Sequence, residues 1–284
     1  MSAPADFAAA GARAVRRAVH GRTTPSESGF PCLQGGPYEK VDTDVGSFWM
    51  LASDEVMRPY MLERGRWDES TGDLLRTLIH PGCRFLDVGA NVGYFSVLAK
   101  QSAPRVEVDA VEPHPTIYGM LEANLWANDV PARRWRVGLA GERLMLPMSS
   151  APMNPGDSRV GQQRGDGRYE LVVAVDSADR LFAGRSFDVV KVDVQGFEPE
   201  VLSGMQRIVR QSPGIVLVVE FWPAPLRERG LDPTEVVNRY RTMGLAIAVH
   251  DDWGIGSCAV EDVVSRCDSA GPNGQVNLVL RPQG

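Results

Sequence analysis

Apolar runs alternate with amphipathic segments along most of the chain, beginning near residue 40. Two runs, 187–193 and 214–221, are nearly continuous in Val, Ile and Leu, which is typical of strands buried on both faces of a parallel sheet. In the segment 115–127, apolar side chains recur at offsets of three, four and eight, which predicts a helix with one apolar face. Further strands are expected at 45–52, 84–88, 106–111, 134–139 and 169–175, and further helices at 54–64, at 69–79, and from 93, 199 and 232 onward.

Two closing strands, 245–249 and 276–280, are expected to pair near the end of the chain. The β-α-β alternation and this final pair predict the α/β class, with a Rossmann-like, doubly wound and mostly parallel sheet. We expect one domain over residues 41–284, with a polar insertion at about 143–168. Residues 1–40 are interpreted as an N-terminal extension and linker, in which 8–20 could form a helical arm.

Composition and charge disfavour several classes of partner. The 284 residues include 30 basic and 36 acidic side chains, a formal net charge of −6, which argues against non-specific binding to nucleic-acid backbones. No apolar run approaches the roughly 20 residues that span a membrane, and no secretory apolar segment is present near the N-terminus. The four cysteines form no C-x-x-C pair or Cys/His cluster. These features predict a cytoplasmic protein that acts on a small molecule.

A glycine-containing turn follows the strand expected at 84–88 and opens the next helix. Gly89 and Gly93 permit a tight turn and close approach of the backbone to a ligand, at the strand end where Rossmann folds bind. The turn has the form G-x-N-x-G, with Asn91 at its centre, and differs from the G-x-G-x-x-G of dinucleotide sites. Asp87, near the end of the strand, suits a cationic ligand such as S-adenosylmethionine, which carries an ammonium and a sulfonium group.

A second acid ends the next strand. Glu112 lies nineteen residues after Gly93, is followed by Pro113, and can accept hydrogen bonds from both hydroxyls of a ribose. Together, the two motifs on consecutive strand ends predict a pocket for a sulfonium nucleoside, with S-adenosylmethionine as the cofactor. An NAD-dependent oxidoreductase is the less favoured alternative on this fold, because the dinucleotide motif is missing.

The chain resembles the FkbM-type methyltransferases over roughly residues 45–282. The resemblance rests on the stretches 65–69, 86–93, 111–115 and 190–204. The last is similar to the family's K-x-D-x-E-G-x-E signature, with Gln195 where the family usually has Glu. The resemblance implies a class I methyltransferase with a seven-stranded sheet, which moves methyl from S-adenosylmethionine to hydroxyl oxygens of natural-product or sugar scaffolds. It also implies cofactor contacts for Glu69, which precedes the first motif, and for Gly138 and Leu139 beside the adenine.

The side chains at the ends of the later strands are the candidates for chemistry. Asp193 and Glu220 end two buried strands, and His250, a weaker candidate, follows the strand 245–249. Three roles stay open for the acid pair: a general base with a positioning partner, ligands of a Mg²⁺-type ion, or structural acids. Lys191 faces the same side of its strand as Asp193, so it is expected to pair with one of the two acids. Asp193 is also expected to contact the cofactor.

Acceptor contacts are expected from the polar insertion. Asn154, Asp157 and Arg159 form an N-x-G-D-x-R pattern in a loop that could cover the acceptor, with a solvated loop as the alternative. Trp222 could line an apolar part of the acceptor pocket, with core packing as its alternative.

The sequence thus predicts an S-adenosylmethionine-dependent O-methyltransferase that acts on a hydroxylated small molecule, without nucleic-acid or membrane partners. A non-catalytic pathway protein that keeps the fold is the alternative. The (N/D)-P-P-(Y/F) motif of adenine-N6 methyltransferases is absent from the sequence. A homodimer is compatible with the N-terminal arm.

Overall fold

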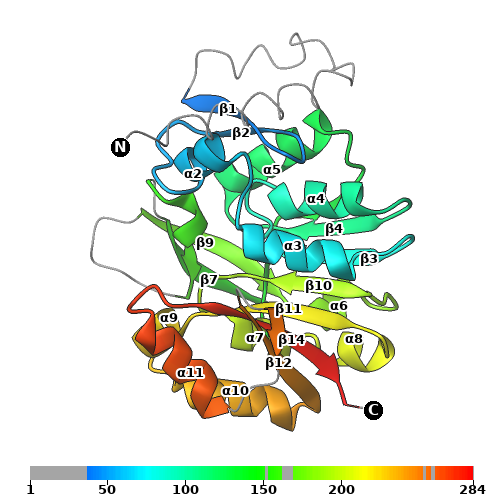
Figure 1. Cartoon of the computed structure of the whole chain (residues 1–284), viewed down its shortest axis with the longest axis vertical. Coiled ribbons are helices and arrows are strands. Elements are labelled where there is room, and N and C mark those ends of the chain that lie inside the picture. Colours follow the sequence, from blue (N-terminus) through cyan, green and yellow to red (C-terminus); the bar gives the residue numbers. More distant parts are fainter. Residues whose placement is uncertain (1–36, 151–152, 162–168, 252–253, 257–259, 284) are drawn as a thin grey trace, which may run out of the picture.

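A central sheet organises the fold, and its strands lie in the order β13-β12-β14-β11-β10-β3-β4-β5 (Figure 1). The computed structural model describes residues 37–150, 153–161, 169–251, 254–256 and 260–283. Strands β5, β4, β3, β10 and β11 are parallel, whereas β14 is antiparallel to both β11 and β12. The strand bounds are β3 Arg84–Val88, β4 Glu107–Val111, β5 Arg133–Trp135, β10 Val189–Val192, β11 Val216–Phe221, β12 Leu245–Asp251, β13 Gly254–Gly256 and β14 Val276–Pro282.

This topology confirms the predicted Rossmann-like, doubly wound fold, including the antiparallel closing pair β12–β14. The sheet differs from the prediction by an eighth strand, β13, which extends β12 as a short hairpin. The carboxyl ends of β3, β4, β10 and β11 point the same way, so the residues that follow these strands gather at one edge of the sheet.

Helices cover both faces of the sheet, each layer with its own buried apolar cluster. Alternate strand residues serve the two layers, since Phe85 of β3 joins the first cluster and Leu86 joins the second. The first layer holds α2 Met57–Arg64, α3 Glu69–Leu78, α4 Tyr94–Ser102 and α5 Pro115–Ala127, and the second α6 Ala178–Leu181, α7 Glu198–Ser203, α8 Gln206–Gln211, α9 Pro223–Glu228, α10 Pro233–Thr242 and α11 Val260–Ser269. None of the described helices is long and apolar enough to cross a membrane.

A second, four-stranded sheet corrects the expected strand at 134–139 and the expected polar insertion at 143–168. Its strands are β6 Gly138–Leu139, β7 Leu144–Ser150, β8 Arg159–Val160 and β9 Tyr169–Asp176, in the order β6-β9-β7-β8. The chain therefore leaves the main sheet after β5 and enters the second sheet at β6. Met148, Val160 and Val173 bury a small core there, but Met, Pro and Ser in β7 weaken the alternating strand pattern in the sequence.

The helix expected from Pro199 is broken into α7 and α8. A Cβ atom at Gly204 would lie 1.8 Å from the carbonyl oxygen of Ala140, so only glycine permits this close approach of two backbones. The contact joins the second layer of helices to the segment that enters the second sheet.

The first hairpin, β1 Tyr38–Asp42 with β2 Ser47–Leu51, begins inside the range expected to be an extension. Asn124 of α5 accepts a hydrogen bond from the Trp49 amide at 2.7 Å and donates to the carbonyls of Trp49 and Val92. Asn124 thereby attaches the hairpin to the turn after β3. The expected arm at 8–20 lies outside the described residues.

Candidate functional site

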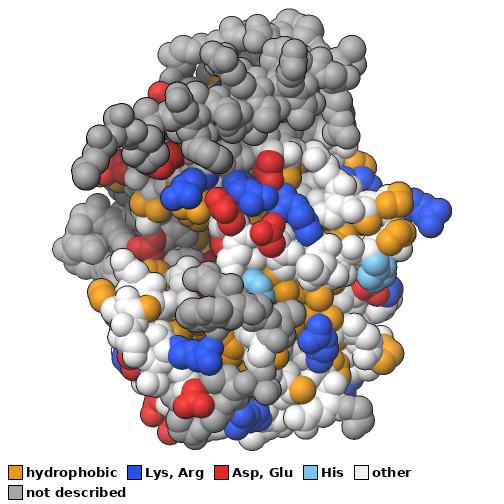
Figure 2. Space-filling model, viewed as in Figure 1, with side chains coloured by type: hydrophobic (Ala, Val, Ile, Leu, Met, Phe, Trp, Pro, Cys, Tyr) orange, Lys and Arg blue, Asp and Glu red, His pale blue; other side chains and the backbone are white. Residues whose placement is uncertain are grey.

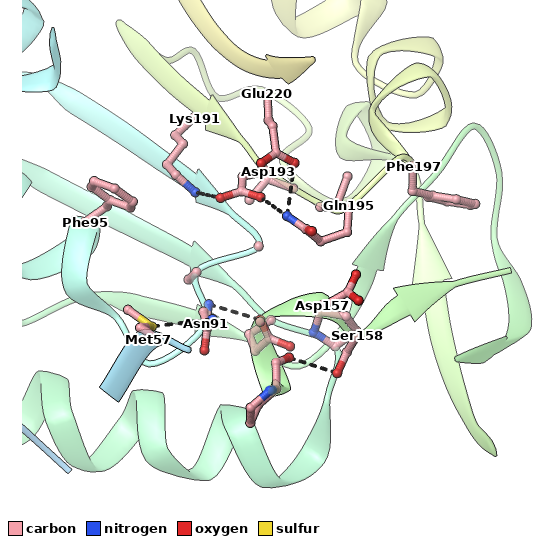
Figure 3. Close-up of a pocket in the computed structure, with 18 of the residues that line it drawn as sticks. Met57, Asn91, Phe95, Asp157, Ser158, Lys191, Asp193, Gln195, Phe197 and Glu220 are labelled. Atoms are coloured by element: carbon pink, nitrogen blue, oxygen red, sulfur yellow. Dashed lines mark hydrogen bonds and ion pairs between the residues drawn. The ribbon is translucent and has the colours of Figure 1, made fainter. Parts of the chain in front are cut away.

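A cavity of about 400 Å³ opens at the carboxyl ends of β3, β4, β10 and β11 (Figure 3). The lining includes apolar residues, such as Met57 of α2 and Phe197, together with the polar groups at the strand ends. Walls of this mixed kind are typical of small-molecule sites. The predicted site residues that line the cavity are Gly89, Asn91, Glu112, Pro113, Gly138, Leu139, Asn154, Asp157, Lys191, Asp193, Glu220 and Trp222. The predicted residues that do not line it are Glu69, Asp87, Gly93, Arg159 and His250.

The turn between β3 and α4 brings the backbone of Gly89 and the residue Asn91 to the cavity. Gly89 has a φ of +77°, and a Cβ atom there would lie 1.9 Å from the carbonyl oxygen of Asp193. Asn91 follows at a φ of +49°, a left-handed conformation that asparagine tolerates better than most residues. Since Gly89 must pack against the Asp193 backbone, the turn after β3 and the end of β10 form one rigid edge of the cavity.

Glu112 lines the cavity from the end of β4. Its carboxylate accepts hydrogen bonds from the backbone amides of His114 at 2.8 Å and Asn91 at 3.1 Å, which fix both oxygens. Burial raises the pKa of Glu112 to about 7, although these two amides oppose the shift. Each oxygen keeps a further lone pair, so the carboxylate can still accept ribose hydroxyls.

We expect Glu112→Ala to weaken binding of S-adenosylhomocysteine by about 1.5–3 kcal/mol, the usual contribution of hydrogen bonds to a charged group. Calorimetric titration measures this, with Glu107→Gln at the opposite end of β4 as the control. Protonation of Glu112 near pH 7 removes its charge. The affinity of the parent for S-adenosylhomocysteine should therefore decrease as the pH is lowered through 7, whereas that of Glu112→Gln should not. Parental affinity in Glu112→Ala would show that the ribose lies elsewhere.

Asp87 lies behind the cavity wall. It is fully buried, pairs in register with Lys191 of β10, and accepts a hydrogen bond from the Ser96 hydroxyl at 2.7 Å. Its Oδ1 has no hydrogen-bond partner in the part of the chain that the structure describes, and burial raises the pKa of this carboxyl. The expected role of Asp87 in cofactor binding stays a prediction, and its position favours an indirect effect through Lys191.

Glu69, the first residue of α3, does not line the cavity. Basic and acidic side chains gather on one part of the surface in Figure 2. The Glu69 carboxylate lies 3.7 Å from Arg66. The preceding residue, Asp68, lines the cavity and caps α3 by accepting a hydrogen bond from the Thr71 amide at 3.1 Å. Glu69 was named from the sequence and its neighbour Asp68 was missed, although an Asp directly before a helical segment is a recognisable N-cap.

Four polar side chains meet at the carboxyl ends of β10 and β11 (Figure 3). Lys191 lies on β10, Asp193 and Gln195 follow that strand, and Glu220 lies near the end of β11. The Lys191 ammonium donates to Asp193 Oδ2 at 2.9 Å, which confirms the predicted pairing, and it lies 4.8 Å from the ring centroid of Phe95. The Gln195 amide donates to Asp193 Oδ1 at 2.8 Å and to Glu220 Oε2 at 3.0 Å. The neutral amide therefore bridges the two carboxyl groups, and the lysine ammonium pairs with Asp193.

The two acids differ in proton affinity. Burial alone would raise the pKa of Asp193, but Lys191 beside it and the amide of Gln195 hold that pKa below its usual value. Burial and the neighbouring charge of Asp193 raise the pKa of Glu220 well above its usual value. At neutral pH the pair therefore favours an ionised Asp193 beside a Glu220 that binds a proton readily.

These residues do not fit the Mg²⁺ alternative. Both oxygens of Asp193 already accept hydrogen bonds, one of them from a lysine ammonium that supplies the neutralising positive charge. Gln195 presents its amide nitrogen to both acids, whereas Mg²⁺ is held by oxygen ligands.

A second cavity of about 220 Å³ adjoins the first, and Asp193 and Glu220 line both. Its other walls include the start of α3, the start of β14 and His250 of β12. The ring Nδ1 of His250 is buried and has no hydrogen-bond partner among the described residues. His250 is thus brought to the rear of the acid pair, and its expected part in the chemistry stays a prediction.

The segment 154–160 forms the cavity wall opposite the acid pair. Asn154 and Asp157 line the cavity, whereas Arg159 is only 4% exposed. The Arg159 guanidinium donates to Asp157 and to Glu228 of α9, each at 2.6 Å, and lies 5.2 Å from the ring centroid of Trp222. Arg159 therefore fixes Asp157 and Trp222 from behind, and is not placed to touch a ligand in the cavity.

Comparison with known proteins finds matches to methyltransferases. The domain model described as "Methyltransferase FkbM domain" matches residues 87–239, more than half of the chain. "Methyltransferase sdnD" of Sordaria araneosa is 29% identical over 195 residues, which cover 52% of this chain and 73% of that protein. "Methyltransferase 1" of Beauveria bassiana (strain ARSEF 2860) is 27% identical over 143 residues, 42% of this chain and 57% of that protein.

Among solved structures, the O-methyltransferase TomG from Streptomyces achromogenes in complex with SAM aligns with a TM-score of 0.45 and 16% identity. The alignment covers 82% of this chain and 88% of that one. The length of the domain match settles the family: this chain belongs to the FkbM-domain methyltransferases and is an S-adenosylmethionine-dependent methyltransferase.

Proposed function

We propose that the protein transfers a methyl group to a hydroxyl oxygen of a small molecule, with Glu220 as the general base. The observation that carries this proposal is the Glu220 carboxyl, which lines the cavity and has a pKa well above its usual value because of burial and the charge of Asp193. An alcohol needs a base that takes its proton as the oxygen attacks, and a base works best when its pKa lies near the working pH.

Asp193 suits a positioning role better than that of the base. Both of its oxygens are held by donors, and Lys191 stabilises its ionised form. A carboxylate stabilised in this way binds a proton poorly at neutral pH. We assign to Asp193 the tasks of holding Lys191 and of orienting polar groups where the cavity meets the glycine turn.

The residues that line the cavity support the proposed nucleoside cofactor. Gly89 brings backbone to the cavity, Glu112 is held by two backbone amides and can accept two ribose hydroxyls, and Gly138 and Leu139 line the part of the cavity assigned to the adenine. When bound, S-adenosylmethionine supplies a methyl carbon that is electrophilic because it is attached to a positively charged sulfur. Asn154, Asp157 and Trp222 remain for the acceptor, so we propose that it has both hydroxyl groups and an apolar face.

The test is incubation with S-adenosylmethionine and a panel of hydroxylated natural products and sugars, followed by mass spectrometry and NMR of the products. We expect a product that has gained one CH₂ unit, with the new methyl on oxygen. A methyl found on nitrogen or carbon would contradict the proposed acceptor. Tight binding of S-adenosylhomocysteine without turnover of any acceptor would favour the non-catalytic alternative.

A further inference from the structure

Gln195 lies where it can control both acids of the site. Its side chain reaches from the turn after β10 to a point between Asp193 and Glu220, and its nitrogen is within 2.8 Å and 3.0 Å of one oxygen of each (Figure 3). We propose that Gln195 is a positioning residue, whose amide ties the two carboxyl groups together and sets which of them takes the proton. This inference rests on the proposed function, in which Glu220 is the base.

The backbone around Gln195 is held in place independently of the acids. Gln195 has a φ of +57°, in the left-handed region that long side chains seldom adopt. Glu198, buried at the start of α7, accepts hydrogen bonds from the amides of Val194 at 3.0 Å and Gly196 at 3.2 Å. Two fixed amides on either side of Gln195 hold its backbone in this conformation, which directs the side chain toward the acid pair.

The neutrality of the amide matters because this corner already holds several acids. Asp87 of β3, Asp68 at the start of α3 and Glu198 of α7 each influence the acid pair through their charge, and His250 of β12 lines the adjoining cavity. Lys191 faces Asp193, Asp87 and Glu220 with a positive charge. A glutamate at position 195 would place a third carboxylate against both acids, whereas the amide supplies two N–H donors without charge.

In the reaction, the proton of the acceptor hydroxyl moves to a Glu220 oxygen while the acceptor oxygen bonds to the methyl carbon. The electron pair of the broken sulfur–carbon bond stays on sulfur, and Glu220 later releases its proton to water. Gln195 holds Glu220 Oε2 and Asp193 lies beside the same carboxyl group, so the two neighbours fix the orientation in which Glu220 receives the proton. A carboxyl free to rotate would lose this alignment.

Three substitutions at position 195 distinguish the effect of the side-chain amide from that of the left-handed backbone. Gln195→Glu keeps the shape and adds a charge, Gln195→Gly suits the left-handed backbone but removes the amide, and Gln195→Asn keeps an amide with a shorter reach. Three quantities are measured: the titration midpoint of the Glu220 carboxyl by ¹³C NMR, the affinity for S-adenosylhomocysteine, and the pH profile of kcat with an accepted substrate. The NMR signal of Glu220 is assigned by its loss in Glu220→Gln.

In Gln195→Glu we expect the Glu220 midpoint and the acid limb of the kcat profile to rise together by about one pH unit or more. In Gln195→Gly we expect parental or higher thermal stability, an unchanged affinity for S-adenosylhomocysteine, and a kcat lower by on the order of 100-fold. Gln195→Asn should recover only part of that loss.

Parental midpoints and kcat in folded Gln195→Glu and Gln195→Gly would overturn the inference, because a purely structural glutamine would change stability alone. The NMR titration needs no acceptor. A shifted midpoint in Gln195→Glu would therefore support control of the acids by Gln195 even if the parent methylated no hydroxyl, a result that would remove only the proposed function.

Discussion

Glu220→Gln is expected to lower kcat by on the order of 10²–10⁴, the contribution of a general base, and to leave the affinity for S-adenosylhomocysteine near that of the parent. The change keeps the size of the side chain and its hydrogen bond with Gln195, so the cavity should keep its shape. Steady-state turnover with an accepted hydroxylated substrate and calorimetric titration with S-adenosylhomocysteine measure the two effects separately.

The pH profile provides a second readout for Glu220. Since the pKa of this carboxyl is raised, the parent should lose activity as the pH falls through that pKa and the base becomes protonated. The profile of Glu220→Gln should lack this loss of activity at low pH. The control Glu107→Gln, which changes an exposed acid at the start of β4, should keep it. A full parental kcat in Glu220→Gln would exclude Glu220 as the base and return Asp193 to consideration.

The fold was largely predictable because its buried strands carry near-continuous apolar runs and its helices keep one apolar face. The same reasoning failed for the second sheet. β7 mixes Leu and Met with Pro and Ser, and its burial depends on β9 and Phe197, which follow it in the chain. Sequence patterns report whether a segment can be buried, but they do not report which distant segment covers it.

The candidate site was predictable where a residue's position on a strand decides its role. Glu112, Asp193 and Glu220 were predicted because each lies at the end of a predicted strand, and all three line one cavity. Asp87 also lies near the edge of the sheet where the cavity opens. However, side chains alternate along β3, and that of Asp87 is buried in the protein beside Lys191. Gln195 was marked in the sequence only by its departure from the family's Glu, and its contacts with both acids could not be foreseen, because they depend on side-chain reach from a left-handed backbone.

Lys191→Met is expected to lower the free energy of unfolding by about 3–5 kcal/mol at neutral pH, the usual cost of removing one partner from a buried ion pair. Lys191 is 3% exposed and pairs with Asp193, and its charge also favours the ionised form of Asp87. Chemical denaturation of the parent and the variant measures the difference. Lys40→Met is the matched control, since Lys40 is a surface residue 3.8 Å from Asp42 and such pairs contribute little.

The pH dependence of this loss identifies its cause. In the parent, Lys191 holds the pKa of Asp193 below its value in the unfolded chain, so the pair stabilises the fold above that unfolded value and the benefit is lost as the pH falls through the folded pKa. Without Lys191, burial leaves the carboxyls with raised pKa values. Their ionised forms then destabilise the folded state at neutral pH, and this penalty disappears once the carboxyls are protonated. The difference between parent and variant should therefore be largest at neutral pH and shrink toward about pH 4.

The double variant Lys191→Met/Asp193→Asn should recover part of the loss. Equal losses at all pH values would mean that Lys191 acts through packing against Phe95 and not through its charge.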